Sequence, residues 1–111
     1  MDYKRELLKG NTECLLLCLI SSQPMYGYQI IKELNRRSNG YFRFKEGTLY
    51  PALHRLEKGK LVKSEWEKSP AGQERRYYQI TEKGRQALSQ KLSLWEDFST
   101  AIKTVIQPET S

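Results

Sequence analysis

The stretch from Thr81 to Gln107 constrains the fold most, because it is predicted to form one long helix. Thr81 is a good N-cap, Glu82 would lie near the positive end of the helix dipole, and Pro108 follows the expected last turn. Gly84 is expected to weaken the first turn by about 1 kcal/mol relative to alanine. About 26 helical residues extend about 39 Å. A chain of 111 residues forms a single domain with a modest core, so this helix is longer than its own domain can cover.

Apolar residues form two neighbouring stripes along this predicted helix. The first repeats like a heptad seam, with Ser99 at the missing step, and consists of Leu88, Leu92, Trp95, Ile102 and Ile106. The second consists of Ala87, Leu94, Phe98, Ala101 and Val105. A single contact with the rest of the domain needs only one stripe. Two stripes therefore predict that the helix packs on its own domain and on a second chain.

A second apolar segment, from Cys14 to Ile20, is apolar all round and must be covered on more than one side, by other elements or by a dimer partner. Cys14 and Cys18 would share one face of a helix. The only histidine is His54, far away in the sequence, so cysteine and histidine cannot assemble a zinc site within one protomer. We interpret the cysteines as small buried side chains in a reducing compartment, and we expect no metal and no cofactor.

The stretch from Gly47 to Leu61 is predicted to form a helix with two different faces, from about Glu46 or Thr48 to Lys58. An apolar stripe consists of Leu49, Leu53 and Leu56. The other face carries hydroxyls, an imidazole and cations with almost no acid, and consists of Thr48, Tyr50, Pro51, His54, Arg55 and Lys58. Thr48 is the predicted N-cap, Pro51 would lie in the first turn, and Gly59 would end the helix. Such a face is typical of a helix that meets phosphates and base edges, although a solvated helix over a small core is the alternative.

The order of the remaining elements predicts a winged helix-turn-helix. A helix from about Gly27 to Arg37 comes before this one, and residues 41–45 alternate aromatic and basic side chains as in a short edge strand. Two strands follow, Leu61–Glu67 and Arg75–Ile80, joined by a turn. Val62, Ser64 and Trp66 would form the buried side of the first strand.

The predicted fold is therefore mainly α with a small β-hairpin: a winged helix-turn-helix plus a long C-terminal dimerisation helix. The expected division is a DNA-binding domain over 1–80, the dimerisation helix over 81–107 and a polar tail over 108–111.

Charge and composition favour a polyanionic partner. The net charge is +6 and the sequence pI about 9.4. No apolar run is long enough to span a bilayer, and the start lacks the order of a signal peptide, so we expect a cytoplasmic protein without a membrane partner. With one histidine, no acidic motif and no phosphate-binding loop, we expect no enzyme and no catalytic residues. A winged-helix module that binds another protein instead of DNA is the alternative function.

Three motifs resemble the PadR family of bacterial transcriptional regulators, and the resemblance extends from about Leu7 to Val105. They are Tyr26-Gly27-Tyr28, the run Gly47-Thr48-Leu49-Tyr50-Pro51-Ala52-Leu53-His54-Arg55-Leu56-Glu57, and Gly72 with Arg75, Arg76 and Tyr77 ahead of Ile80-Thr81-Glu82-Lys83-Gly84. The single C-terminal helix is similar to that of the shorter members. The resemblance implies a homodimer that binds a palindromic operator in double-stranded DNA and usually acts as a repressor. It also implies that the C-terminal helix packs on the partner's N-terminal helix.

The resemblance, together with the charge pattern, gives the expected DNA-binding residues. In the predicted helix that ends at Lys58 these are Thr48, Tyr50, Pro51, His54 and Arg55. Thr48 and Tyr50 suit phosphates or base edges, and His54 or Arg55 suits a guanine edge, although Tyr50 could equally cover the apolar stripe. The expected phosphate contacts are Tyr28, Lys32, Lys63, Lys68, Arg75 and Arg76. Because Arg75 and Arg76 alternate along the strand, one of them is expected to face the core side and pair with Glu65 or Glu67.

Trp95 has two interpretations at the expected dimer interface. It is either a large core residue, or a stacking wall that accepts a planar aromatic effector between two copies of the chain, as the short members of the family suggest. The residues expected in the dimer interface are Leu15, Leu19, Leu88, Leu92, Trp95, Phe98, Ile102 and Val105.

Overall fold

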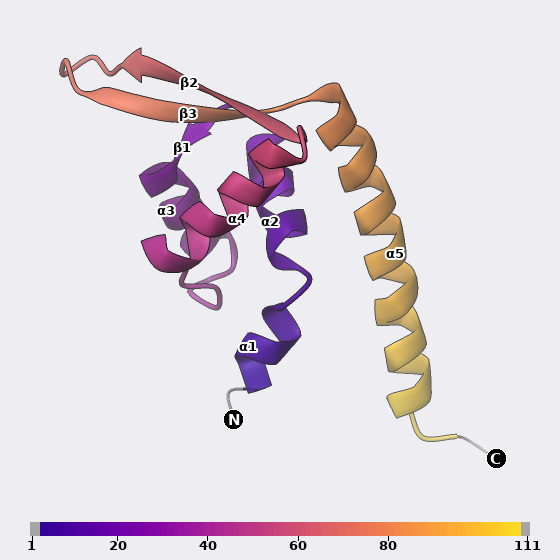
Figure 1. Cartoon of the computed structure of the whole chain (residues 1–111). Coiled ribbons are helices and arrows are strands. Elements are labelled where there is room, and N and C mark those ends of the chain that lie inside the picture. Colours follow the sequence, from indigo (N-terminus) through magenta and orange to yellow (C-terminus); the bar gives the residue numbers. More distant parts are fainter. Residues whose placement is uncertain (1–2, 110–111) are drawn as a thin grey trace.

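The computed structural model describes residues 3–109 and contains five helices and three strands within that range (Figure 1). In chain order they are α1 (Tyr3–Leu8), α2 (Thr12–Ile20), β1 (Met25–Tyr26), α3 (Gly27–Arg37), α4 (Glu46–Lys58), β2 (Val62–Lys68), β3 (Glu74–Ile80) and α5 (Glu82–Ile106). The fold class is the predicted one, with α2, α3 and α4 as the three core helices. The helix α1 was not predicted. Thr110 and Ser111 of the predicted polar tail lie outside the described residues.

The core lies where α2, α3 and α4 meet beneath the sheet (Figure 1). The predicted stripe of α4 is confirmed, because Leu49, Leu53 and Leu56 are almost completely buried. From α3, Ile30 and Leu34 enter the same core. Burial of each such side chain contributes about 1.5–3 kcal/mol to folding. This packing fixes which face of α4 points outward.

The helix α4 starts at Glu46, one of the two predicted starts, but the predicted N-cap at Thr48 is wrong. Lys45 is the N-cap, so Thr48 lies inside the first turn and Pro51 lies deeper in the helix. The backbone N–H groups of Thr48 and Leu49 both donate to the carbonyl of Lys45, each at 3.0 Å, which explains why the helix starts before Thr48. Since Pro51 has no N–H, it cannot donate the usual helical hydrogen bond to the carbonyl of Gly47.

The end of α4 agrees with the prediction, because Gly59 is the C-cap. The left-handed conformation, however, falls one residue later, at Lys60 with φ of 63°. The end of α3 is likewise as predicted, with positive φ at Asn39 and Gly40.

The predicted hairpin is part of a three-stranded antiparallel sheet in the order β1-β3-β2. Met25 and Tyr26 pair with Tyr78 and Tyr77 of β3, a pairing that the sequence analysis missed because β1 has only two residues. The predicted edge strand at 41–45 is wrong, since this segment is a loop. Phe44 of this loop is buried in the core between the helices. The N–H of Phe42 donates to the hydroxyl of Ser38 at 2.9 Å, which connects the loop to the end of α3.

The far half of the hairpin extends beyond the helices (Figure 1). Val62 is buried and Ser64 half-buried as predicted, but Trp66 is 66% exposed, so its predicted burial is wrong. The period-2 pattern of β2 is regular, but the core beneath it ends before Trp66.

Thr81 is the N-cap of α5, as predicted, and its hydroxyl accepts the N–H of Gly84 at 3.0 Å. Gly84 is buried where α5 meets the end of the hairpin, and a side chain there would collide with the carbonyl of Leu61 and with Ile80. Gly84 is therefore required for close packing, which outweighs its low helix propensity.

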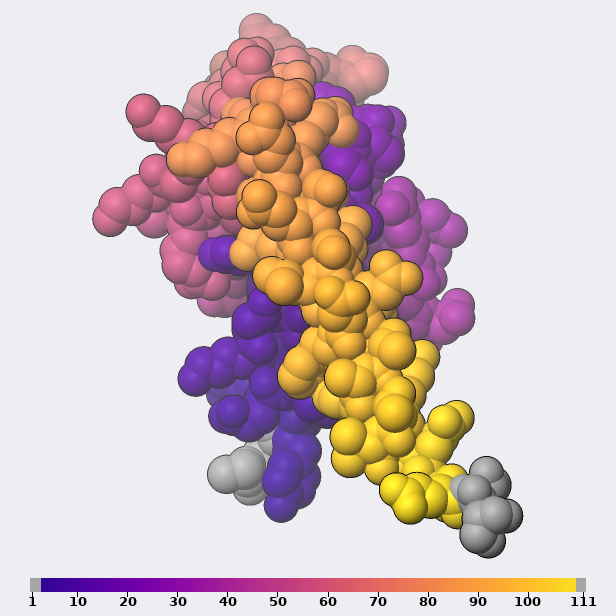
Figure 2. Space-filling view, turned by 90° about the vertical axis from the view of Figure 1, so that its right-hand side faces the viewer, coloured from indigo at the N-terminus to yellow at the C-terminus, as the bar shows by residue number. Residues whose placement is uncertain are grey.

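Beyond its first turns α5 leaves the domain and forms a long ridge on the molecule (Figure 2). Many of its large apolar side chains are exposed, up to 84% for Val105. The exposed set is Leu92, Leu94, Trp95, Phe98, Ile102, Val105 and Ile106. In contrast, Leu19 and Leu88 are buried in the core of the single chain, and Leu15 is half-buried. Within the described residues, no helix combines the length and the apolar character that a membrane span requires.

The predicted burial of both cysteines is wrong for the single chain. Cys18 is exposed and Cys14 is only half-buried. Their neighbours Leu16, Leu17, Leu19 and Ile20 fill the core, so the helical rotation leaves Cys18 on the outer side of α2.

Candidate nucleic-acid interface

The outward face of α4 carries the residues that the sequence analysis selected. Thr48, Pro51, His54 and Arg55 are exposed, and Tyr50 is 43% exposed. The one acid of the sequence between Gly47 and Lys58 is Glu57, which is half-buried. The face therefore presents hydroxyls, an imidazole and cations.

Tyr50 lies on the flank of α4 that faces the hairpin. Its hydroxyl rests on Gly27 at the start of α3, where an added Cβ would overlap it. Tyr50 also lines a cavity of about 400 Å³ together with Trp66 and Arg76 of the hairpin. Tyr50 was predicted to bind DNA and Trp66 was not. The structure places both side chains in the wall of this one cavity.

Arg76 joins the hairpin to α4. Its guanidinium donates to Glu57 at 3.0 Å and to the hydroxyl of Ser64 at 2.8 Å, and Ser64 donates in turn to Glu57. One of the two arginines was expected to pair with an acid, and this is confirmed, but the partner is Glu57 and not Glu65 or Glu67. Beneath this cluster, burial raises the pKa of the Tyr78 phenol, a shift that the nearby Arg76 opposes.

The other predicted phosphate contacts are spread over both faces of the hairpin. Arg75 stacks on Tyr26, with the guanidinium carbon 4.3 Å from the ring centroid. Lys63 is exposed and alternates with Val62 and Ser64, so it points away from the helices. Lys68 is exposed where β2 enters the turn. Arg75 also lines the cavity that contains Tyr50 of α4, whereas Lys63 and Lys68 do not.

The start of α3 adds two further predicted positions. Tyr28 is 65% exposed and Lys32 is exposed. They are separated by one helical turn and so lie on the same side of α3.

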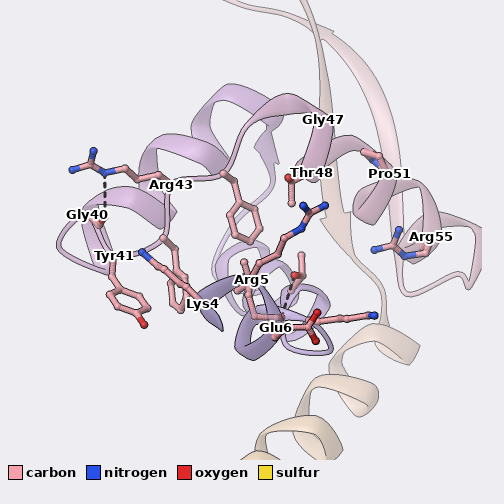
Figure 3. Close-up of a pocket in the computed structure, with 15 residues that line it drawn as sticks. Lys4, Arg5, Glu6, Gly40, Tyr41, Arg43, Gly47, Thr48, Pro51 and Arg55 are labelled. Atoms are coloured by element: carbon pink, nitrogen blue, oxygen red, sulfur yellow. Dashed lines mark hydrogen bonds between the residues drawn. The ribbon is translucent and has the colours of Figure 1, made fainter. Parts of the chain in front are cut away.

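Thr48 and Arg55 lie on the opposite flank of α4, facing α1. There they line an open groove of about 1100 Å³ between α1, the loop 40–44 and the first turns of α4 (Figure 3). Arg55 forms an ion pair with Glu13 of α2 at 3.4 Å, and Glu13 also lies 3.9 Å from Lys91 of α5. Arg55 is therefore partly neutralised by the domain itself.

The groove contains charged residues that the sequence analysis did not select. Among the described residues that line it are five cations and one acid, Glu6. The cations are Lys4, Arg5, Lys9, Arg43 and Arg55. The sequence signal was present, as the charged stretch 3–9 and the basic positions in 41–45, but nothing in the sequence indicated that these two segments meet beside α4.

Three core helices followed by a hairpin, with the acid-poor side of the third helix exposed, define a winged helix-turn-helix protein. Residues 16–90 match the Transcriptional regulator PadR-like family. The chain belongs to this family of transcriptional regulators, which confirms the resemblance seen in the motifs.

Individual relatives agree with this assignment. A transcriptional regulator of Mycobacterium tuberculosis is 34% identical over 98 residues, which cover 88% of each chain. The crystal structure of a PadR-like transcriptional regulator from Bacillus cereus has 36% identity and a TM-score of 0.83, covering 94% of this chain and 99% of that one. A transcriptional regulator from Clostridium thermocellum has 30% identity and a TM-score of 0.84, covering 92% and 99%.

Proposed function

We propose that this regulator binds double-stranded DNA sequence-specifically as a homodimer and represses transcription. The acid-poor outward face of α4 carries this proposal, because a helix that lies in the major groove must offer donors and few repelling acids; the exposed acid of α4 is Glu46, at its first residue. The hairpin lies beside the same helix, and Arg76 holds it there through Glu57. It contacts the flanking backbone in this proposal, with Lys68 at its outer end.

Within α4, His54 is the side chain that we assign to base contact. It is exposed near the middle of the outward face, whereas Thr48 and Arg55 lie on one flank and Tyr50 on the other. A flanking residue in a helix that lies in the major groove is closer to phosphates than to bases.

The exposed apolar stripes of α5 support the homodimer. Phe98 is 65% exposed and Val105 is 84% exposed. Monomeric soluble proteins rarely expose so many large apolar side chains on one helix. Two-fold symmetry brings the same surface of each copy together and sets two α4 helices at a fixed spacing, which matches a palindromic operator. A DNA-binding repressor of this kind acts in the cytoplasm.

Selection of bound DNA from a random pool tests the proposal. The expected result is a palindrome with half-sites about one helical turn apart. His54→Ala should relax the selected sequence at one base position, whereas Lys68→Ala should weaken all sequences alike. A wild-type protein that enriches no sequence and shifts no fragment would favour the alternative, a winged-helix module that binds another protein.

Trp95 supports a second part of the proposal, relief of repression by a planar aromatic compound. Its side chain is 53% exposed among the exposed apolar residues of α5, and a symmetric dimer pairs it with a second copy. Quenching of tryptophan fluorescence by a panel of planar dyes tests this, with Trp95→Ala as the control for emission from Trp66. Quenching that survives in Trp95→Ala would remove Trp95 from the ligand site.

A further inference from the structure

We infer that the groove between α1, the loop 40–44 and α4 is a second phosphate-binding surface, which holds the DNA backbone on the side of α4 opposite the hairpin. This inference rests on the proposed function. It adds Lys4, Lys9 and Arg43 to the DNA contacts and gives the short helix α1 a role in binding.

The geometry of α4 requires a contact of this kind. A helix that lies in the major groove is bordered by the backbones of both strands, because the groove is only about 12 Å wide. One flank of α4 carries Tyr50 and faces the hairpin. The other flank carries Thr48 and Arg55 and faces the basic groove, which Thr48, Pro51 and Arg55 also line (Figure 3). The groove is thus continuous with the proposed recognition face.

The charge of the groove fits phosphate and not protein. Five cations and one acid line it among the described residues. Arg55 is already paired with Glu13, but Lys9 and Arg43 are exposed. Concentrated positive charge of this kind attracts a polyanion and releases condensed counterions when phosphates bind.

Contacts within the walls of the groove hold two of these cations, Lys4 and Arg43, in place before DNA binds. Phe44 anchors the loop in the core, and Arg43 donates from Nε to the carbonyl of Gly40 at 3.1 Å. The ammonium of Lys4 lies 4.0 Å from the ring centroid of Tyr41, which ties α1 to the loop. Preorganised cations lose less conformational entropy on binding than free surface side chains do.

The salt dependence of DNA binding tests the inference. The variant Lys9→Ala/Arg43→Ala removes two groove cations, and Lys83→Ala/Lys103→Ala removes two exposed cations from α5 as the matched control. Binding is measured on a random-sequence duplex of about 30 base pairs, which accommodates two half-sites. Because each protomer of the proposed dimer loses two cations, the groove variant should flatten the plot of log affinity against log salt by about 3.6, or about 0.9 for each of four lost phosphate contacts. The control should keep the wild-type slope.

Two further measurements separate the possible outcomes. Arg43→Lys in the Lys9→Ala background keeps one charge and should recover about half of the lost slope. On a duplex that carries the selected palindrome, ethylation interference should show the affected phosphates on the strand opposite to those lost in Lys68→Ala. If wild type and groove variant bind DNA with the same slope, the inference is wrong while the proposed function stands. Inorganic polyphosphate that binds wild type but not the groove variant, with an unchanged DNA slope, would make the groove a small-anion site and also overturn the inference. A wild type that binds no DNA removes the proposed function and the inference with it.

Discussion

Arg76 of β3 donates to Glu57 of α4 at 3.0 Å, a contact that links the hairpin to the proposed recognition helix across 19 residues of sequence. Both side chains are partly exposed, and Ser64 completes the cluster by accepting from Arg76. The pair connects the two elements that our proposal places on DNA.

Loss of this link should affect DNA binding more than folding. Glu57→Gln is expected to lower the free energy of unfolding by about 1 kcal/mol or less, because solvent screens a half-exposed ion pair. DNA affinity should fall more than tenfold, since the hairpin is no longer held beside α4. Chemical denaturation and gel shift measure the two effects. Glu65→Gln, on the other face of the hairpin, should change neither, and a loss of stability without loss of affinity would contradict the positioning role.

Gly27→Ala should displace Tyr50 without unfolding the protein. An added Cβ overlaps the phenol hydroxyl, which lies at the end of a side chain that is able to rotate away. We expect a change in unfolding free energy within about 1 kcal/mol, because alanine also favours the helix, together with weaker DNA binding. In the Tyr50→Ala background the same change should have no further effect on affinity, and additive losses would show that Gly27 acts independently of Tyr50.

Gly84→Ala should destabilise the fold in spite of the higher helix propensity of alanine. The new methyl group would collide with the backbone carbonyl of Leu61, which cannot rotate away as a side chain does. The expected loss is about 1–3 kcal/mol, measured by thermal or urea denaturation. Ser89→Ala, at an exposed position of the same helix, should be neutral or slightly stabilising. An increase in the melting temperature of Gly84→Ala would contradict the close packing.

A charged side chain among the exposed apolar residues of α5 should dissociate the proposed dimer. Phe98→Glu is expected to give a monomer in sedimentation experiments, because an unpaired carboxylate would be buried at the interface. Thr100→Glu adds the same charge on the side of α5 away from both stripes and should leave the dimer intact. Equal masses for wild type and Phe98→Glu would exclude this face from the interface.

The two cysteines should react at different rates. Burial raises the pKa of the Cys14 thiol, the neighbouring Cys18 raises it further, and Lys91 opposes the shift. A raised pKa lowers the fraction of reactive thiolate at pH 8. The single thiol of Cys18→Ser should therefore react slowly with a disulfide reagent and accelerate above pH 9, whereas the exposed thiol of Cys14→Ser should react sooner. Equal rates at pH 8 would contradict the shift.

The helices and the hairpin could be predicted because their signals are local. The stripe of Leu49, Leu53 and Leu56 and the cap at Thr81 each depend on neighbours within a few turns. The predictions that were wrong depend on contacts between segments that are far apart in the sequence. Trp66 is exposed because the core covers only the first part of β2. The alternation of residues along a strand does not show how far the core extends beneath it.

The candidate site was predicted in its residue types more than in its arrangement. The outward face of α4 follows from its buried stripe, but the partner of Arg76 does not, because Glu57 is far away in the sequence. The loop 41–45 shows the same limit. Its aromatic residues alternate like a strand, yet Phe44 is drawn into the helical core and the residues around it carry cations to α1.

Pro51 has a consequence for what α4 offers to a partner. Without an N–H from Pro51, the carbonyl oxygen of Gly47 lacks its usual helical donor and keeps acceptor capacity, and Gly47 is exposed. A surface of cations and hydroxyls thus includes one fixed backbone acceptor, the kind of group that pairs with the exocyclic amines of adenine and cytosine. Substitution of side chains cannot move this oxygen, but replacement of Pro51 by a residue with an N–H would return it to the helical ladder.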